Sequence, residues 1–183
     1  KPFLAVIGGA KIGDKIEVLN NLMGKVDAFL IGGGMAYTFY KARGLSIGKS
    51  LLEADKLEVA RQIMDKARAA GVRFLLPIDN VVADAFKADA SIKVVGENIE
   101  EGWMALDIGP STAKMFADEI AKARTVVWNG PMGCFEMAPF AAGTMAVAKA
   151  LAANRQCTSI VGGGDSVSAV NQSGLADKIT HIS

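Results

Sequence analysis

Residues 158–170 read Thr-Ser-Ile-Val-Gly-Gly-Gly-Asp-Ser-Val-Ser-Ala-Val, which predicts a short strand, a glycine turn and the start of a helix. The glycines at 162–164 let the backbone approach a ligand closely and adopt positive φ. The first N–H groups of the following helix, together with the helix dipole, attract phosphate. Asp165 and Ser166 are residue types that often begin helices, and the Asp165 carboxylate could hold a metal ion.

The same pattern of an apolar run and a glycine turn occurs at three other places in the chain. The runs at 3–7, 28–31 and 125–128 lead into Gly8-Gly9-Ala10-Lys11, Gly32-Gly33-Gly34 and Asn129-Gly130-Pro131-Met132-Gly133. In an open parallel sheet, ligands bind beyond the carboxyl ends of the strands. The sequence therefore predicts that the four turns form one shared site.

The rest of the chain alternates between strand and helix patterns. Helices are predicted over residues 14–23, 35–42, 53–70, 112–123 and 139–153, and further strands over 73–77 and 106–109. Residues 79–102 are less regular, with a small excursion from the sheet at 92–95, and another strand begins at 181–183. This order predicts an α/β fold, doubly wound and Rossmann-like, whose single parallel sheet has helices on both faces and right-handed crossovers.

The composition is that of one ordinary soluble domain of 183 residues. Twenty Lys and Arg nearly balance 19 Asp and Glu, so no overall positive field would recruit nucleic acid. Cys134, Cys157 and the single His181 cannot supply the usual ligands of a zinc site. No apolar run is long enough for a membrane span. We therefore expect small-molecule or protein partners, a reducing cytoplasmic location with an organellar form as the alternative, and Trp103 and Trp128 in the core.

Two familiar phosphate-binding motifs are close to the sequence but do not match it. Residues 44–50, Gly-Leu-Ser-Ile-Gly-Lys-Ser, have three residues where a P-loop needs four, and no buried strand precedes them, so they are predicted to be a surface connection. A dinucleotide oxidoreductase would need a third glycine after Gly8 and Gly9, and an acidic residue where residues 32–34 are all glycine. That alternative is disfavoured.

Four charged residues lie close to the predicted turns. Lys11, in the first turn, could reach a transferring phosphoryl group as a point charge. Lys15 is one helical turn further on and shares that face, although a solvated lysine is an equal alternative. Asp14 is predicted to cap a helix, and Glu136, after the turn at 129–133, could accept hydrogen bonds from a ribose.

Five segments, taken together, resemble the C-terminal, nucleotide-binding domain of phosphoglycerate kinase; they are residues 8–15, 31–36, 102–110, 127–136 and 162–166. The resemblance covers essentially the whole chain in the right order. It implies a phosphotransferase that binds Mg-ADP or Mg-ATP and transfers phosphoryl reversibly between 1,3-bisphosphoglycerate and ADP, giving 3-phosphoglycerate and ATP. It also implies that an N-terminal domain, absent from this chain, holds the phosphoglycerate, and that the full-length enzyme is a monomer.

The resemblance also implies a role for individual residues. Those lining the adenine pocket would be Gly9, Ala10, Gly33, Gly34, Ala105, Leu106 and Pro131, with Glu136 on the ribose. Those meeting phosphates would be Lys11, Lys15, Asn129, Gly163, Gly164, Asp165 and Ser166; of these, Lys11 would be catalytic, stabilising the phosphoryl group in transit, and Asp165 would hold Mg²⁺. Ala105 stands where the family often has glycine, and Ser166 replaces a frequent threonine.

The ends of the chain lead to a further expectation. The sequence begins at Lys1 and stops at Ser183, before the last glycine-rich phosphate loop and helix that the family places there. We therefore expect residues 1–183 to be a nucleotide-binding domain cut short, without substantial activity by itself. The alternative from another class is a nucleotide-binding module with no chemistry of its own.

Overall fold

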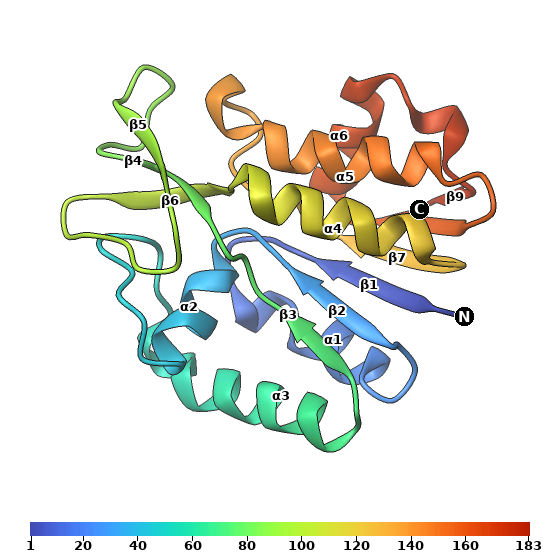
Figure 1. Cartoon of the computed structure of the whole chain (residues 1–183), viewed down its shortest axis with the longest axis horizontal. Coiled ribbons are helices and arrows are strands. Elements are labelled where there is room, and N and C mark those ends of the chain that lie inside the picture. Colours follow the sequence, from blue (N-terminus) through green and yellow to red (C-terminus); the bar gives the residue numbers. More distant parts are fainter.

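The computed structural model describes residues 1–183 and contains two sheets (Figure 1). The larger sheet has six strands in the order β3-β2-β1-β7-β8-β9, and every neighbouring pair is parallel. Its strands are β1 (Phe3–Ile7), β2 (Ala28–Ile31), β3 (Arg73–Leu75), β7 (Thr125–Asn129), β8 (Thr158–Gly162) and β9 (His181–Ile182). The predicted α/β class is confirmed, and the expected strand at the end of the chain is β9.

A second, antiparallel sheet has the order β5-β4-β6, so the prediction of a single sheet was wrong. Its strands are β4 (Asn80–Ala83), which was not predicted, β5 (Ile92–Val95) and β6 (Met104–Ile108). The segment around Leu106 had been assigned to the parallel sheet. β6 shows the same pattern of burial as β1, because both are covered on two faces, and such a run does not reveal which sheet a strand joins.

The helices cover both faces of the larger sheet (Figure 1). On one face lie α1 (Ile16–Leu22), α2 (Met35–Ala42) and α3 (Leu57–Ala69), and on the other lie α4 (Pro110–Lys122), α5 (Ala142–Ala153) and α6 (Gly164–Ser173). Short 3₁₀ turns at 12–14, 54–56 and 138–140 precede α1, α3 and α5, which is why these helices begin later than predicted; a fourth lies at 176–178. No helix has both the length and the apolar character needed to cross a membrane.

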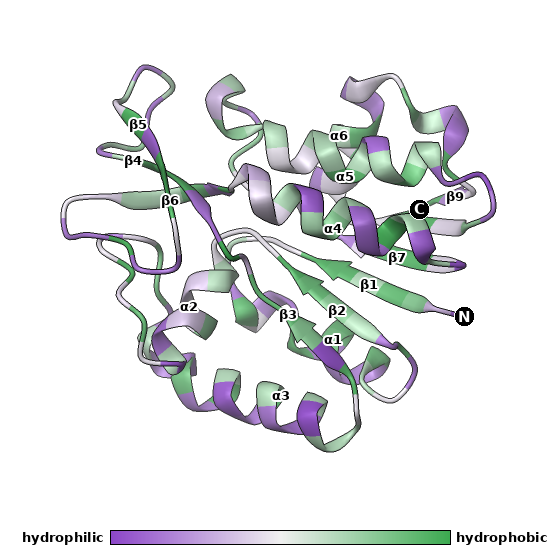
Figure 2. Cartoon of the chain, viewed as in Figure 1, coloured by the Kyte–Doolittle hydropathy of each residue, from purple (hydrophilic) through white to green (hydrophobic).

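Alternate residues of the central strands belong to two separate cores, as expected for strands buried on both faces. The core beneath α1–α3 takes Ala5, Ile7, Phe29 and Ile31, and the core beneath α4–α6 takes Leu4, Val6, Ala28 and Leu30. The strands are accordingly mostly apolar, whereas α3 and α4 alternate polar and apolar segments (Figure 2). Trp128 is fully buried as predicted, but Trp103 is only half-buried at the edge, with Lys93 Nζ 4.3 Å from the centre of its ring.

The predicted side-chain caps do not form. Asp14 lies in the 3₁₀ turn before α1, whose N-cap is Lys15, and makes no capping hydrogen bond. The N-cap of α6 is Gly163, with a φ of 88°, and neither Asp165 nor Ser166 caps that helix. The first N–H groups of α6 therefore have no side-chain oxygen of their own helix as a partner, which leaves them available to a ligand.

The glycine turns after β1 and β2 are in direct backbone contact, and this contact excludes side chains. Gly33 has a φ of 74°, and a Cβ atom there would lie 2.5 Å from the backbone N and O of Gly9. Its N–H donates to the carbonyl of Met132 at 3.1 Å, and the N–H of Met35 donates to the carbonyl of Gly9 at 3.0 Å. Only glycine fits such an approach.

We predict that Gly33→Ala destabilises the fold much more than Gly44→Ala. Both glycines have positive φ, but a Cβ at Gly44 would meet no atom within 4 Å. Gly44→Ala should cost about 1–2 kcal/mol from backbone strain alone, and Gly33→Ala roughly 2–5 kcal/mol, because steric overlap is added. Urea unfolding of both variants measures this difference. Equal losses would show that the turns can separate at little cost.

Candidate functional site

Four adjacent parallel strands, β2, β1, β7 and β8, end at one edge of the larger sheet, and a glycine turn follows each of them. The turns are hydrogen-bonded to one another. Gly8 N–H donates to the Asn129 carbonyl at 2.9 Å, Gly9 N–H to the Pro131 carbonyl at 3.1 Å, and Gly130 N–H to Ser166 Oγ at 2.6 Å. The predicted shared edge is therefore present.

A pocket of about 760 Å³ opens between these turns and the small sheet. Nine residues proposed from the sequence line it: Gly9, Ala10, Gly33, Gly34, Ala105, Leu106, Pro131, Glu136 and Asp165. Another hollow of about 530 Å³ lies between α2, α3 and β3, but none of the glycine turns reaches it. The first pocket is therefore the candidate site.

The remaining proposed residues are grouped beside the pocket rather than in its wall. Lys15 Nζ donates to Asn129 Oδ1, and a Cβ placed on Gly163 would lie 3.1 Å from the same oxygen. Burial lowers the pKa of Lys15, while Asp14 and Asp165 act in the opposite direction. Lys15 and Asn129 thus meet at the N-terminal end of α6, and Lys15 is half-buried there, not a fully solvated lysine.

Three further proposed residues differ in how they could act there. Lys11 is exposed and directly follows the pocket-lining Ala10. Gly164 is the exposed first residue of α6. Ser166 is fully buried, and its Oγ accepts the Gly130 N–H. The Ser166 hydroxyl therefore fastens the turn after β7 to α6.

Seven lining residues had no predicted site role: Tyr37, Lys49, Leu51, Phe86, Met104, Cys134 and Met137; Met132 and Gly133 also line the pocket and belong to the predicted turn at 129–133. Two of them, Leu51 and Phe86, are large apolar side chains that are 46% and 65% exposed. Apolar residues in connecting segments follow no helical or strand periodicity, so the sequence does not reveal that they line a pocket. They make one part of the pocket apolar and suited to a flat organic group.

The segment 44–50 is more than the surface connection predicted for it. Lys49 lines the pocket, and its Nζ donates to the Asp84 carbonyl at 2.7 Å. Ser50 is buried, and its Oγ accepts the Ala105 N–H at 2.9 Å. The segment therefore supplies Lys49 to the pocket wall and binds β6 through Ser50. Only the tertiary structure reveals this role.

The chain has neither a cluster of metal-binding side chains nor an ionised thiol in the pocket. No group of three or more His, Cys, Asp or Glu side chains is placed to hold a metal ion. Burial raises the pKa of the pocket-lining Cys134 to about 11, so its thiol is neutral at physiological pH. At one end of the pocket lie the carboxylate of Asp165 and, beside it, the amine of Lys15.

Comparison with known proteins identifies the family. The family model described as "Phosphoglycerate kinase" matches residues 1–183. The chain belongs to the phosphoglycerate kinase family. A phosphoglycerate kinase of Koribacter versatilis is 62% identical over 185 residues, and one of Clostridium novyi is 59% identical over 184; both matches cover 100% of this chain and 46% of the relative. The chain thus spans about half the length of the curated relatives it matches.

Solved structures of phosphoglycerate kinases agree with the fold. The structure from Coxiella burnetii has a TM-score of 0.97 at 43% identity, and that from Pyrococcus horikoshii has 0.83 at 32%. Each match covers 100% of this chain, and 47% and 46% of those chains. Membership of the phosphoglycerate kinase family confirms the resemblance and overturns the oxidoreductase alternative; the roles of single residues remain predictions.

Asp107 is a buried carboxyl directly behind the pocket wall. It follows Leu106 on β6 and is 1% exposed. Its Oδ1 accepts the Ile108 N–H and its Oδ2 the Gly143 N–H in the first turn of α5, both at 2.9 Å. Burial raises the pKa of Asp107 to about 7, although the two N–H groups act in the opposite direction. Asp107 thus joins β6 to α5 and holds a proton up to near-neutral pH.

We predict that Asp107 stabilises the fold less as pH rises from about 4 to about 7. The measure is the free energy of unfolding of the wild type minus that of Asp107→Asn. In this window the folded state keeps the proton and the unfolded state has released it, so deprotonation favours unfolding. The slope should be about 1.4 kcal/mol per pH unit and should disappear above pH 7. Urea unfolding of both proteins across this range measures it. A difference that grows with pH would show that the ionised carboxylate is the favoured form.

Proposed function

We propose that this chain is the nucleotide-binding half of a phosphoglycerate kinase. It would bind Mg-ADP or Mg-ATP for reversible phosphoryl transfer between 1,3-bisphosphoglycerate and ADP, giving 3-phosphoglycerate and ATP in glycolysis. The observation that carries the proposal is the pocket where the glycine turns of β1, β2 and β7 meet the start of α6. The cytoplasmic location and the monomeric full-length enzyme belong to the same proposal.

The two ends of the pocket suit the two ends of a nucleotide. Leu51, Phe86 and Leu106 provide apolar surface for an adenine ring. Glu136 lies at the rim, is exposed, and can accept hydrogen bonds from ribose hydroxyls. Ala105 lines the wall with its single methyl group, and its N–H already donates to Ser50 Oγ.

The opposite end suits a chain of phosphates. The α6 N-terminus presents backbone N–H groups and the positive end of the helix dipole. Lys15 and Asn129 meet beside it, and Lys11 adds an exposed positive charge directly after the pocket-lining Ala10. This arrangement supports the proposed phosphate contacts of Lys11, Lys15, Asn129 and residues 163–166.

Asp165 fits a magnesium ion that is bound together with the nucleotide. Mg²⁺ is usually held by one or two carboxylates, several waters and the substrate phosphates, not by a cage of protein ligands. One exposed carboxylate at the start of α6, with no acidic cluster around it, is consistent with that chemistry. When bound, Mg²⁺ would neutralise part of the phosphate charge.

In the proposed reaction the protein positions the groups and stabilises charge, and no covalent intermediate is needed. The turns orient the nucleotide, while Lys11 stabilises the phosphoryl group as it moves. The acyl phosphate would be held by the half of the relatives that this chain does not match. The alternative is a module that binds nucleotide without any chemistry.

The first test is ligand choice. Mg-ADP should raise the melting temperature of the chain more than NAD at equal concentration, because the pocket offers phosphate contacts at only one end. At about 100 times the dissociation constant, the gain in stability would be about 2.7 kcal/mol. Asp165→Asn should lose the part of the protection that depends on Mg²⁺. Equal protection by NAD, or none by Mg-ADP, would contradict the proposal.

The second test separates chemistry from binding. In a full-length protein containing both halves, Lys11→Ala should lower kcat by roughly 100-fold or more, with little change in the KM for nucleotide. Lys25→Ala is the matched control, because Lys25 is exposed in the turn before β2, at the opposite edge of the sheet. A change confined to KM would mean that Lys11 only anchors phosphates. Full activity without Lys11 would overturn its proposed catalytic role.

A further inference from the structure

The candidate pocket has walls from two different sheets. Gly9, Gly33 and Pro131 belong to turns of the larger sheet, whereas Leu106 belongs to β6 and Phe86 to the β4–β5 connection of the smaller sheet. The width of the apolar end therefore depends on how the two sheets are held together.

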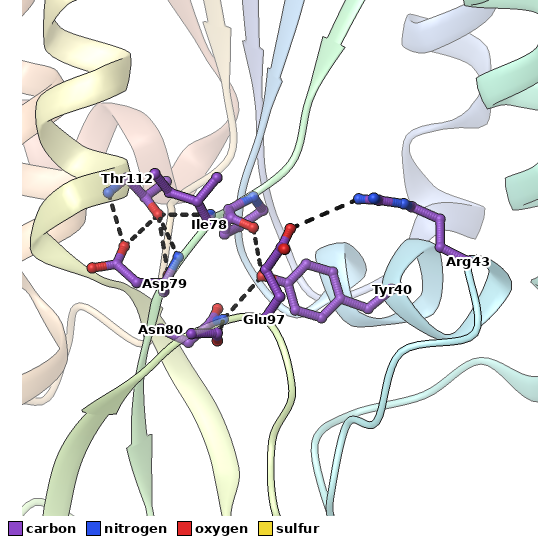
Figure 3. Close-up of polar contacts among 9 residues, drawn as sticks. Tyr40, Arg43, Ile78, Asp79, Asn80, Glu97 and Thr112 are labelled. Carbon is purple, nitrogen blue, oxygen red and sulfur yellow. Dashed lines mark hydrogen bonds and ion pairs between the residues drawn. The ribbon is translucent and has the colours of Figure 1, made fainter.

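Asn80, the first residue of β4, joins the sheets through a buried hydrogen-bond network (Figure 3). Tyr37 Oη donates to Asn80 Oδ1 at 2.7 Å. Asn80 Nδ2 donates to Tyr40 Oη and to the Gly96 carbonyl, both at 3.0 Å, and Tyr40 Oη donates to the Pro77 carbonyl at 2.5 Å. One amide thus connects α2, the β3–β4 crossover and the β5–β6 connection.

This network has little freedom to rearrange. Asn80 and Tyr40 are 0% exposed and Tyr37 is 1% exposed, so all three side chains are shielded from bulk water. Both donors and the carbonyl of the Asn80 amide are used, and an unsatisfied buried group is costly. Burial raises the pKa of Tyr37 well above its ordinary value and that of Tyr40 to about 12, so both hydroxyls remain donors at physiological pH.

The crossover is also hydrogen-bonded to α4 on the other face of the larger sheet (Figure 3). Thr112 Oγ1 accepts the Ile78 N–H at 3.0 Å, and Asp79 Oδ1 accepts the Thr112 N–H at 2.8 Å. On the α2 side, Arg43 and Glu97 form an exposed ion pair at 4.0 Å, which contributes little by comparison. The crossover itself is therefore held in place, and the hydrogen bonds of Asn80 to Tyr37 and Tyr40 fix α2 relative to it.

Tyr37 links the Asn80 network to the pocket. Tyr37 is one of the residues that line the cavity, and its hydroxyl is the group bound by Asn80. The ring also packs edge-on against Tyr40, with 5.4 Å between the ring centroids. A shift of Asn80 would move the wall at the apolar end, while the α6 N-terminus, on the other side of the larger sheet, would stay in place.

We propose that Asn80 is a positioning residue for the apolar, base-binding end of the pocket. By tying Tyr37 and Tyr40 to β4 it sets the separation of the two walls, and so the affinity for the nucleoside part of the ligand but not for its phosphates. This inference rests on the proposed nucleotide-binding function.

The test measures two ligands by titration calorimetry: Mg-ADP directly, and inorganic pyrophosphate with Mg²⁺ by competition against ADP. Asn80→Ala should weaken Mg-ADP binding roughly five- to tenfold, at the lower end of couplings between linked sites, and change pyrophosphate binding less than twofold. Asn154→Ala is the matched control, because Asn154 donates to the carbonyls of Ile120 and Ala123 at the end of α4, away from the pocket. It should leave both affinities unchanged.

A second variant keeps the test decisive if Asn80→Ala does not fold. Tyr40→Phe retains the ring but removes the hydroxyl that links Asn80 to Pro77, and it should show the same selective loss. Unchanged ADP binding in a folded variant, or an equal loss for both ligands, would overturn the positioning role. Failure of the unaltered chain to bind Mg-ADP would instead overturn the proposed function.

Discussion

The close contact between glycine turns is the constraint on which the rest of the structure depends. Backbone atoms of the turns after β1, β2 and β7 pack against one another, and a Cβ on Gly130 would lie 2.1 Å from the Gly8 carbonyl oxygen. Because backbone atoms of these turns are in direct contact, their strand ends are held close together. A ligand at this edge can therefore contact backbone groups from several strands at once.

Helix α6 adds charge preference to that surface. Its first turn has no side-chain cap, and the residue that would be expected to cap it, Ser166, instead accepts a hydrogen bond from Gly130. The same serine thus fixes the helix against the neighbouring turn and leaves the helix N-terminus free. With Lys15 close by, this end of the pocket favours negative charge.

Buried polar groups hold the small sheet in its place beside the large one. Asn80 joins it to α2, Asp107 joins β6 to α5, and Ser50 binds the Ala105 N–H. Each bond is directional, so together they define the orientation of the small sheet more narrowly than apolar contacts alone would. The pocket has its shape because the two sheets are fastened at several separate points.

The sequence by itself determined the α/β class, the four glycine turns at one edge and the nine pocket residues within or beside the recognised motifs. The class and the turns follow from local patterns: apolar runs of strand length, helical spacing and residues without side chains. The assignment of Ala105 and Leu106 to the pocket came only from the resemblance to the phosphoglycerate kinase family. The second sheet, the role of Lys49 and Ser50, and the lining by Phe86 and Leu51 were decided only by tertiary structure. The physical reason is that strand pairing and burial of a loop side chain depend on partners distant in the chain, for which no local pattern of residues is specific.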